Sequence, residues 1–467
     1  MSNRTTSLQN LLGIDNNDAT LRLQSIASLG ETALFDYAGL PGLRTVSEPE
    51  LNDDEILIRT RQVGTLERCP KCGCPFGDQF KRNGTRAQYV QDEPRGLCSV
   101  SIEIRRQSYR CMRCTTVSKQ PMVGVDAKRH LTTRLLRYVQ MHSCLESFSA
   151  VAFRTGLSET TVKDIFNDYT TQLDLTVRFD TPRVLGIDGV YIGGRECAIL
   201  TDLEASLVID VWADYKLEHL IAGLKRLPGR EQIQVVVMDM SRLLRRAVQE
   251  ALPQAVIVID RHHINTLANE GVDEVRKQLR KGITRRKGKL TMCRRELLRK
   301  HWHQLDTEQQ KELAKWFELQ PKLKLAYDIK ESFFAIWYSS SIDSARERYH
   351  EWMNMFPADD EHRFLTAGFK KLLTAMRNWE EYILNYFEHP HTNAFTERSN
   401  GKIKDFLRAA RGSSFETVRA KIIYGTLIRQ LVTSPRKRRP AKRALTGCVL
   451  TPPISQTSLF DDLAEFG

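Results

Sequence analysis

Three acidic residues, far apart in the sequence, could together perform metal-dependent chemistry. Asp188 lies within an otherwise apolar segment, "RVLGIDGVYIGG" (183–194). An unpaired carboxylate is costly in such surroundings, so we expect a divalent cation to compensate it. Asp239 follows the apolar segment "IQVVVM", and Glu397 lies in "NAFTERSNGKIK". Three converging carboxylates offer the hard oxygen ligands that suit two magnesium ions, and such a pair of ions catalyses phosphoryl transfer.

The sequence around the first two acids predicts the elements that position them. The expected strands are "RVLGIDGVYIGG", "ECAILTD", "SLVIDVWAD", "IQVVVMD" and "AVIVID". The first three follow one another directly, and helices are expected after the third, fourth and fifth. This order is that of a ribonuclease-H-like domain. Asp239 would end the fourth strand, at the edge where α/β sheets collect their binding sites. The alternative interpretation of Asp239 is the N-cap of the next helix.

Glu397 is expected on a helix with two distinct sides. At about 100° per residue, one side holds Asn393, Glu397, Asn400 and Lys404. Another side holds Phe395, Ile403, Phe406 and Ala410. Such a helix can pack its apolar side on the sheet and turn Glu397 toward the two aspartates. The asparagines and Lys404 would then orient the acid or contact a phosphate. A glutamate on a polar helix face is usually only solvated, but the two upstream aspartates favour a shared site.

Six of the ten cysteines lie between residues 66 and 125, and four of them form two Cys-x-x-Cys pairs. The pairs are Cys69 with Cys72 and Cys111 with Cys114. Two such pairs complete a tetrahedral site for a structural zinc ion. The 38 residues between the pairs exceed the usual spacing. However, "VSIEIRRQSYR" predicts a strand that leads into the second pair, as in a zinc ribbon. Cys74 and Cys98 are alternative ligands or buried thiols.

A helix-turn-helix is predicted at residues 147–169, after an amphipathic helix at 132–145. Gly156 falls in the turn, and Ser158 suits the N-cap of the second helix. That helix would expose four side chains to a DNA major groove. They are Glu159, Thr160, Lys163 and Asn167. The alternative is a helical hairpin that binds nothing, which the acidic residues of this helix favour mildly.

The composition indicates the class of partner. The chain has 467 residues, a net charge of +13 and a pI near 9.2. This balance favours a polyanionic partner, most commonly nucleic acid. The N-terminus lacks the blocks of a signal peptide, and apolar runs such as "AVIVI" are too short to span a bilayer. We therefore expect a cytoplasmic protein without membrane contact, whose paired cysteines bind metal rather than form disulfides.

Together these motifs resemble the DDE transposases of bacterial insertion sequences, specifically the ISL-three family. The resemblance covers residues 66 to 430 and is most specific in "GIDGVYIG", "VVVMDMSRLLRRAVQEALPQAVIVIDRHHI" and "NAFTERSNGKIK". It implies that Asp188, Asp239 and Glu397 form the catalytic triad and bind two Mg²⁺ or Mn²⁺ ions. "DRHHI" is similar to a family motif D-R-F-H, which Asp260 and His263 match, while a histidine replaces the aromatic residue. Asp260 therefore competes with Asp239 as the second acid, but we favour Asp239 because Asp260 also suits a helix N-cap, with His263 supporting the site.

The expected fold class is multidomain α/β, with a ribonuclease-H-like DDE domain interrupted by a long helical insertion. A zinc-ribbon-like segment and a helix-turn-helix precede that domain. The expected units are an N-terminal segment of unknown role (1–65), a zinc-binding domain (66–125), a helix-turn-helix domain (130–178), the first part of the catalytic domain (183–270), the helical insertion (271–388), the last part of the catalytic domain (389–430) and a basic, flexible tail (431–467).

The expected function is that of a transposase in the bacterial cytoplasm, associated with the nucleoid. It would bind the terminal inverted repeats of an insertion sequence, cleave the strands and join the freed 3′-hydroxyls to target DNA. The resemblance implies double-stranded DNA as partner, and a homodimer or larger assembly, because two element ends must be held together. The alternatives are a catalytically inactive DNA-binding regulator and a ribonuclease-H-like nuclease without strand transfer.

Overall fold

The structure is a computed structural model, and it describes residues 36–432 except 53, 65, 97, 282–292, 357–361 and 410–411. Contacts divide the chain into Met1–Ile428 and Arg429–Gly467. Of the second unit, only residues 429–432 are described, and they belong to the last helix. The predicted basic tail thus lies almost entirely outside the described residues.

The sheet that carries the acids has five strands. They are β9 (Val184–Ile192), β10 (Arg195–Asp202), β11 (Leu207–Trp212), β12 (Val235–Met238) and β13 (Val256–Ile259). Their order in space is β11-β10-β9-β12-β13. Strand β10 is antiparallel to both β9 and β11, whereas β9, β12 and β13 are parallel. The predicted succession of strands and helices from residue 183 is confirmed.

Each face of this sheet has its own apolar contacts. Side chains alternate between the two faces of a strand. Leu185, Ile187, Val236 and Met238 point to a core that includes residues of α6 (Leu217–Arg226) and α7 (Arg242–Ala251). The alternate residues Val184, Val235, Val237 and Val258 form a separate cluster on the other face. The short β-branched runs "VVV" and "VIVI" are buried on both faces, as is typical of parallel strands.

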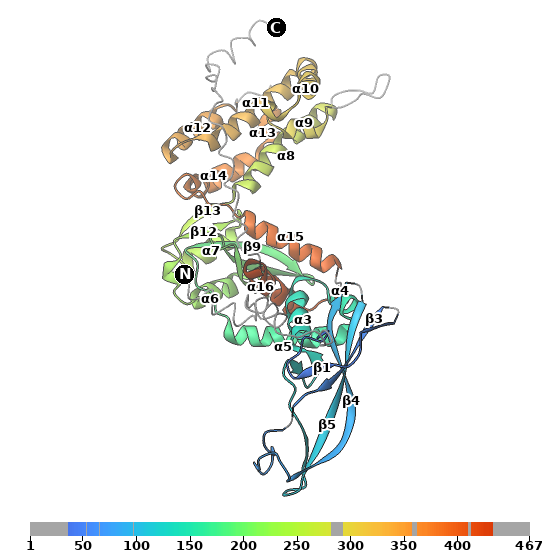
Figure 1. Cartoon of the computed structure of the whole chain (residues 1–467). Helices are drawn as coiled ribbons and strands as arrows, with labels where there is room; N and C mark the ends of the chain where they lie inside the picture. Colours follow the sequence, from blue (N-terminus) through green and yellow to red (C-terminus); the bar gives the residue numbers. More distant parts are fainter. Residues whose placement is uncertain are drawn as a thin grey trace. The chain divides into compact units, whose positions relative to one another are not determined.

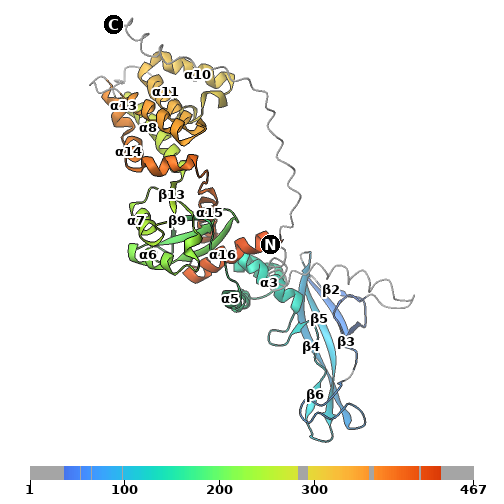
Figure 2. The ribbon, with the colours of Figure 1, turned by 90° about the vertical axis from the view of Figure 1, so that its left-hand side faces the viewer.

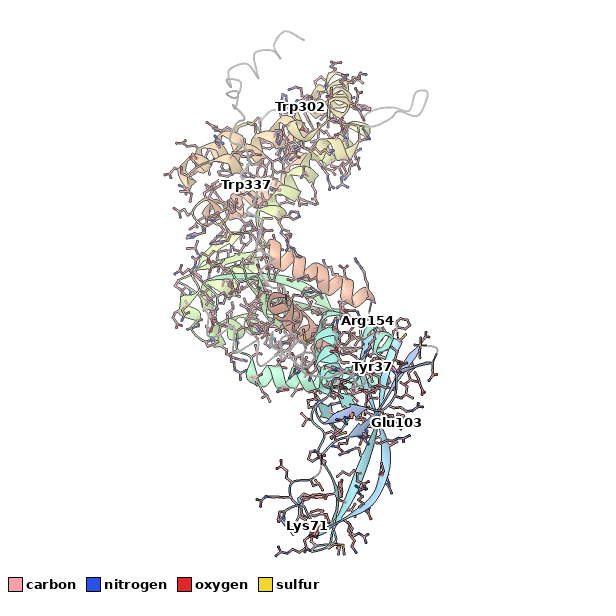
Figure 3. The ribbon with its side chains drawn as sticks, viewed as in Figure 1. Tyr37, Lys71, Glu103, Arg154, Trp302 and Trp337 are labelled. Carbon is pink, nitrogen blue, oxygen red and sulfur yellow. The ribbon has the colours of Figure 1, made fainter. Side chains whose placement is uncertain are left out.

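A series of helices lies between β13 and the helix that carries Glu397. They are α8 (Arg261–Lys281), α9 (Arg295–Arg299), α10 (Thr307–Leu319), α11 (Pro321–Ala335), α12 (Ile342–Asn354), α13 (Arg363–Gly368) and α14 (Lys370–Leu384), with 3-10 turns at Trp302–Gln304, Ile336–Tyr338 and Asn385–Phe387. Their buried residues belong to the same apolar core as the sheet. Figure 3 shows Trp337 among them, where its Nε1 donates to Asn265 of α8. Helix α8 crosses residue 271, the predicted start of the helical insertion, without interruption.

The N-terminal part of the described chain is a sheet of eight strands. They are β1 (Leu43–Thr45), β2 (Glu50–Asn52), β3 (Glu55–Gln62), β4 (Phe80–Arg95), β5 (Cys98–Cys111), β6 (Val117–Lys119), β7 (Val125–Asp126) and β8 (Leu131–Thr132). Strand β3 pairs in parallel with β5, and Ile58 packs with Ile102 and Ile104 in one core. Strands on both sides of residue 65, the predicted domain boundary, belong to this one sheet.

Three helices follow this sheet: α3 (Thr133–Leu145), α4 (Phe148–Thr155) and α5 (Glu159–Thr176). The chain ends its described part with α15 (Ala394–Ala409) and α16 (Phe415–Val432). Figure 1 shows α15 lying beside β9 of the five-stranded sheet. Among the described helices, none is both long and apolar enough to cross a membrane.

Candidate active site

Three aspartates form a row along one edge of the parallel part of the sheet. Met238 of β12 is level with Ile187 of β9 and with Ile259 of β13. The residues that follow, Asp188, Asp239 and Asp260, are therefore neighbours on three adjacent strands. Each lies two or four residues after a member of the valine cluster, so all three side chains lie on the same face of the sheet as that cluster. Strand register alone thus brings residues 72 positions apart into one site.

The helix α15 lies against this same face because β9 has a glycine, Gly186, at the point where the helix crosses it. A Cβ on Gly186 would lie 2.4 Å from Thr201 Oγ1 and 2.6 Å from Thr396 Oγ1. The two threonine hydroxyls are themselves 2.6 Å apart and hydrogen-bonded. Glycine is the residue that allows such a close approach of helix and strand. One turn of α15 is thereby fixed directly over β9, and Glu397 follows Thr396.

Two asparagines of α15 hold the acids in place. The Nδ2 of Asn400 donates to Asp188 Oδ2 at 2.6 Å. At the start of the helix, the backbone N–H of Asn393 donates to Asp260 Oδ1 at 3.3 Å. Its Nδ2 donates to the carbonyl of Ile187 at 3.4 Å. Asn393 and Asn400 are both buried, so these contacts tie the helix to two of the three strands.

The face of α15 that contacts the sheet differs from the predicted one. Its buried residues are Thr396, Ser399, Asn400 and Ile403. Of the predicted apolar side, only Ile403 is fully buried, while Phe395 and Phe406 are half-buried and Ala410 lies outside the described residues. Small polar side chains thus replace the expected apolar contact. Lys404 is exposed, so the structure does not place this predicted site residue beside the acids.

His263 of α8 lies between the acids. Its Nδ1 is 3.0 Å from Asp239 Oδ1, 3.4 Å from Asp260 Oδ2 and 3.7 Å from Glu397 Oε1. The hydrogen bond with Asp260, together with the charges of the surrounding acids, raises the pKa of His263 to about 9, although burial opposes this shift. A protonated imidazole ring therefore accompanies the carboxylates.

The acids differ in how easily they ionise. Burial raises the pKa of Asp188. Burial and the charge of Asp188 raise the pKa of Asp239 to about 7, because the two carboxyl groups are within hydrogen-bonding reach. Burial, followed by contact with Asp260, raises the pKa of Glu397. For Asp260, burial acts in the same direction, but hydrogen bonds from His263 and Asn393 lower the pKa overall.

The carboxylate oxygens fit a divalent cation. Ligand atoms of Asp239, Asp260 and His263 lie within 4.8 Å of one another. Asp239 Oδ1, Asp260 Oδ2 and Glu397 Oε1 are buried, and none has a well-aligned hydrogen bond within the described part of the chain. Unsatisfied buried oxygens of this kind are costly unless a ligand completes them. Clustered carboxylates are the ligands that Mg²⁺ and Mn²⁺ prefer.

Sequence reasoning missed Tyr215, which lies beside this site. Its ring is 3.4 Å from the position that a Cβ on Gly189 would occupy. Burial raises the pKa of Tyr215 to about 12, and a hydrogen bond with Ser241 opposes the shift. Tyr215 lies between β11 and α6, and no motif in that segment singles it out.

Four cysteines lie close together at the open end of the β4–β5 hairpin, where β4 begins and β5 ends. The sulfurs of Cys69, Cys72, Cys111 and Cys114 lie within 4.8 Å of one another. Measured separations are 3.5 Å for Cys69 with Cys114 and 3.7 Å for Cys72 with Cys111. Tetrahedral zinc with bonds of about 2.3 Å requires sulfurs about 3.8 Å apart. The long spacing between the pairs is explained by the hairpin, whose two strands fill it.

The structure distinguishes the two remaining cysteines of this region. Cys74 Sγ lies 3.4 Å from Cys111 Sγ, and the carbonyl of Cys74 accepts from the N–H of Cys69. Cys74 is thus a fifth thiol beside the cluster. Cys98 begins β5, whereas Cys111 ends it. At about 3.3 Å per residue the two are about 43 Å apart along the strand, so Cys98 cannot join the cluster.

The predicted helix-turn-helix has the expected local geometry. Gly156 ends α4 with φ of 70°, and the hydroxyl of Ser158 accepts from the N–H of Thr161 at 3.1 Å. Val162 and Ile165 pack into a core with α3 and α4. The four predicted DNA-contacting residues all lie exposed on α5. They are Glu159, Thr160, Lys163 and Asn167.

Comparison with known proteins identifies the family. A family model described as a transposase, of the DDE type and the ISL-three family, matches residues 185–422, about half of the chain. The chain belongs to this transposase family. The match contains Asp188, Asp239, Asp260 and Glu397, and membership implies DNA as the partner and the use of a divalent metal. Among curated proteins, no match is found.

Proposed function

We propose that the chain is a DNA transposase that binds the terminal inverted repeats of an insertion sequence and catalyses metal-dependent strand cleavage and strand transfer. The observation that carries this proposal is the convergence of Asp188, Asp239 and Glu397 on one face of the sheet. The strand order, with three antiparallel strands followed by two parallel ones, supports a ribonuclease-H-like fold for this part. Family membership supplies DNA as the substrate class.

Exposure favours Asp239 over Asp260 as the second acid of the triad. A metal ion that binds both a carboxylate and a DNA phosphate must lie at an open surface. The side chain of Asp239 is 25% exposed and that of Glu397 is 31% exposed, whereas that of Asp260 is only 2% exposed. Asp260 instead receives the N–H of Asn393 and contacts His263. We therefore assign Asp260 a positioning role.

Two Mg²⁺ or Mn²⁺ ions would be held by Asp188, Asp239 and Glu397, and would activate the attacking oxygen and stabilise the leaving 3′-oxygen. Two neighbouring asparagines, Asn393 and Asn400, position the acids for metal binding. Asn400 fixes the rotamer of Asp188 through a 2.6 Å hydrogen bond. Asn393 joins the start of α15 to Asp260 and β9, which keeps Glu397 above the aspartates. Electrostatic preorganisation of this kind reduces the barrier because the groups need not rearrange during reaction.

Two further parts would contact DNA outside the active site. The exposed residues of α5 are placed to read a major groove, as in other helix-turn-helix proteins. A structural zinc ion held by the four clustered cysteines would fix the end of the hairpin next to them. A dimer or larger assembly would bring two element ends together.

Strand transfer in vitro tests the proposal. The full chain is mixed with Mg²⁺ and with duplexes that carry the DNA flanking its reading frame. We expect nicking and joining by the wild type, and a loss of at least 1,000-fold in both with Glu397→Gln, as for an electrostatic catalytic group. Asp405→Asn, an exposed acid on the same helix, is the matched control and should retain activity. Activity that survives Glu397→Gln would refute the assignment.

Two other outcomes select the alternatives. Nicking without joining would identify a nuclease. Specific binding without nicking, in both Mg²⁺ and Mn²⁺, would identify an inactive DNA-binding regulator.

A further inference from the structure

The long hairpin of the N-terminal sheet extends beyond the strands that flank it. Strand β4 pairs with β5 from Phe80 to Arg95, but its other edge pairs with β8 only at Gln91. Strand β3 accompanies β5 only as far as Arg105, and beyond it β5 pairs with the short β6. Figures 1 and 2 show β4 and β5 as a ribbon, with β6 beside it in Figure 2. We call residues 80–91 and 104–119 the ribbon.

The ribbon carries charge of one sign. Residues 80–91 include three basic side chains and residues 104–119 include five, and neither segment contains an acid. The nearest acid of β5, Glu103, precedes the ribbon and pairs with Arg59 and Arg105 (Figure 3). The ribbon thus carries eight positive side chains and no negative one.

Strand register gathers five of these residues on one face. Residues directly opposite each other in an antiparallel pair point to the same side. Lys81 is opposite Arg110, and Arg86 is opposite Arg106. Lys119 of β6 is opposite Ser108, which lies between the two arginines of β5 on the same face. We call this set the basic face: Lys81, Arg86, Arg106, Arg110 and Lys119.

Within the described part of the chain, the positive charges of the basic face are not paired with acidic side chains. Within the described residues, no ion pair includes any of its five members. Arg106 is half-buried, and its guanidinium donates only to neutral acceptors: Gln62 Oε1, Gln88 Oε1 and the carbonyl of Gln120. Burial lowers the pKa of Arg106, and no acid offsets that shift. Like charges placed directly opposite each other destabilise a strand pair, so this arrangement costs stability unless an anion binds.

Protection of an exposed strand edge does not account for the pattern. Lysines and other charged residues on edge strands do prevent sheets from pairing with one another. Such protection requires charged residues only on the edge strand β4, and either basic or acidic residues would provide it. Arg110 lies on β5, which is paired there with β4 on one side and with β6 on the other. A ligand of opposite charge explains both the sign and the facing pairs.

We propose that the basic face of the ribbon is a second DNA-binding surface, separate from the helix-turn-helix, which binds the phosphate backbone of duplex DNA. The proposal rests on the proposed function for its substrate. Arg106 and Arg110 are four residues apart, or about 13 Å along the strand. This matches the width of the major groove of about 12 Å, which also admits a two-stranded ribbon. Phosphate contacts of this kind are independent of base sequence.

A pair of matched double variants tests the proposal in the full chain. Arg86→Gln/Arg110→Gln removes one charge from each strand on the basic face. Arg82→Gln/Arg105→Gln removes one charge from each strand on the opposite face, since Arg82 and Arg105 alternate with the basic face. All four side chains are exposed, so neither variant empties a core position. The probe is a labelled 40-base-pair duplex of random sequence, titrated between 50 and 300 mM salt.

Two lost phosphate contacts should reduce the slope of log affinity against log salt by about 1.8. Binding at low salt should weaken about tenfold or more, while the opposite-face variant stays within about twofold of the wild type. Equal effects of the two variants, or no effect of either, would overturn the proposal. Stronger binding of single-stranded RNA of the same length would overturn the choice of duplex DNA.

Circular dichroism and zinc content establish that each variant is folded. If Arg86→Gln/Arg110→Gln is unfolded, Lys81→Gln/Lys119→Gln tests the same face with the same expected change of slope. Binding to random duplex requires neither metal nor catalysis. Failure of this test therefore leaves the strand-transfer result unaffected, and loss of strand transfer leaves the salt slope unaffected.

Discussion

At the scale of single residues, the burial of Asp239 and the charge of Asp188 make metal binding depend on pH. The pKa of Asp239 is raised to about 7, so at pH 6 this group holds a proton that must leave when a cation binds. We expect the affinity for Mn²⁺ to rise about tenfold per pH unit up to about pH 7 and to level off above it. Calorimetry in two buffers of different ionisation enthalpy measures both the affinity and the protons released. Equal affinity at pH 6 and pH 8 would contradict the assignment.

The same shift also affects stability in the absence of metal. The folded-state pKa of Asp239 lies above its ordinary value of 3.8. The folded protein thus binds this proton more tightly than the unfolded chain, and this contribution to stability is lost as the pH rises through about 7. Asp239→Asn should remove that pH dependence, which chemical denaturation at pH 5 and pH 8 can measure.

A change of ligand chemistry distinguishes Asp239 from Asp260. A thiolate is a softer ligand than a carboxylate and disfavours Mg²⁺ more than Mn²⁺. We expect Asp239→Cys to be inactive in strand cleavage with Mg²⁺ and to recover at least tenfold with Mn²⁺. Asp260→Cys, if Asp260 only positions α15 and His263, should lose activity equally with both ions. Recovery by Mn²⁺ in Asp260→Cys alone would reverse the assignment.

The sequence could predict that these carboxylates lie close together, but it favoured Asp239 over Asp260 only because Asp260 also suits a helix N-cap. An acid within or directly after an apolar strand is costly, and that cost is visible in the sequence for Asp188, Asp239 and Asp260. Asp239 and Asp260 both directly follow short apolar strands, so their local sequences are similar. Their exposure differs because α15 and α8 cover the edge unequally, and this depends on contacts 133 residues apart, such as that of Asn393 with Asp260.

At the scale of elements, the position of α15 depends on the absence of a side chain at Gly186. A Cβ there would lie under 3 Å from three side-chain oxygens, two of them on α15 and its N-cap. We expect Gly186→Ala to lower the free energy of unfolding by about 1–3 kcal/mol, as for overpacking, and to reduce strand cleavage because Glu397 moves from the aspartates. Denaturant titration and a cleavage assay measure the two effects.

Gly401→Ala is the matched control for that variant. Gly401 lies on α15 itself, and a Cβ there would meet nothing within 4 Å. Alanine is favoured over glycine within a helix by about 0.5–1 kcal/mol, so this variant should be as stable as the wild type or more so. Equal losses in both variants would show that α15 does not depend on close approach at Gly186.

Element boundaries and order were predictable where the pattern of residues is local. The apolar strands of the five-stranded sheet and the helices that follow them could be read directly from the sequence. The buried side of α15 could not, because the sheet beneath it offers Gly186 and Thr201 rather than an apolar surface. Small hydroxyl and amide groups therefore fit there, although the helix also has an apolar side with Phe395 and Phe406.

At the scale of the whole molecule, α16 joins α3 and α5 to the five-stranded sheet. Arg419 donates to Asp210 of β11 at 2.8 Å and lies 3.6 Å from Asp174 of α5. The hydroxyl of Tyr424 donates to the same Asp174 at 2.5 Å. A Cβ on Gly425 would lie 2.9 Å from the carbonyl of Cys144 in α3. No local pattern predicts these contacts, because the residues that make them are more than 200 positions apart in the sequence.

Lys421 is a buried residue at the centre of these contacts of α16. Its ammonium group donates to the carbonyls of Ser143 and Glu146 at the end of α3. It also lies 4.1 Å from the ring centroid of Phe148 in α4 and 5.0 Å from that of Phe406 in α15. A positive charge at the C-terminus of a helix is favourable, and it satisfies carbonyls that the helix leaves free. One side chain thus links α3 and α4 to α15, the helix that carries Glu397.

We expect Lys421→Met to preserve apolar packing but to leave those carbonyls without their donor, at a cost of about 1–3 kcal/mol in unfolding free energy. Exchange of backbone amide hydrogens should increase in rate more in α3–α5 than in the five-stranded sheet. The contacts between α16 and α3–α5 weaken, while each part keeps its own apolar core. Random-duplex binding should stay within about twofold, since the exposed face of α5 is unchanged, whereas strand cleavage at element ends should fall. Lys315→Met, at an exposed position of α10, is the control. Uniform quickening across the chain would instead indicate that Lys421 only stabilises the fold as a whole.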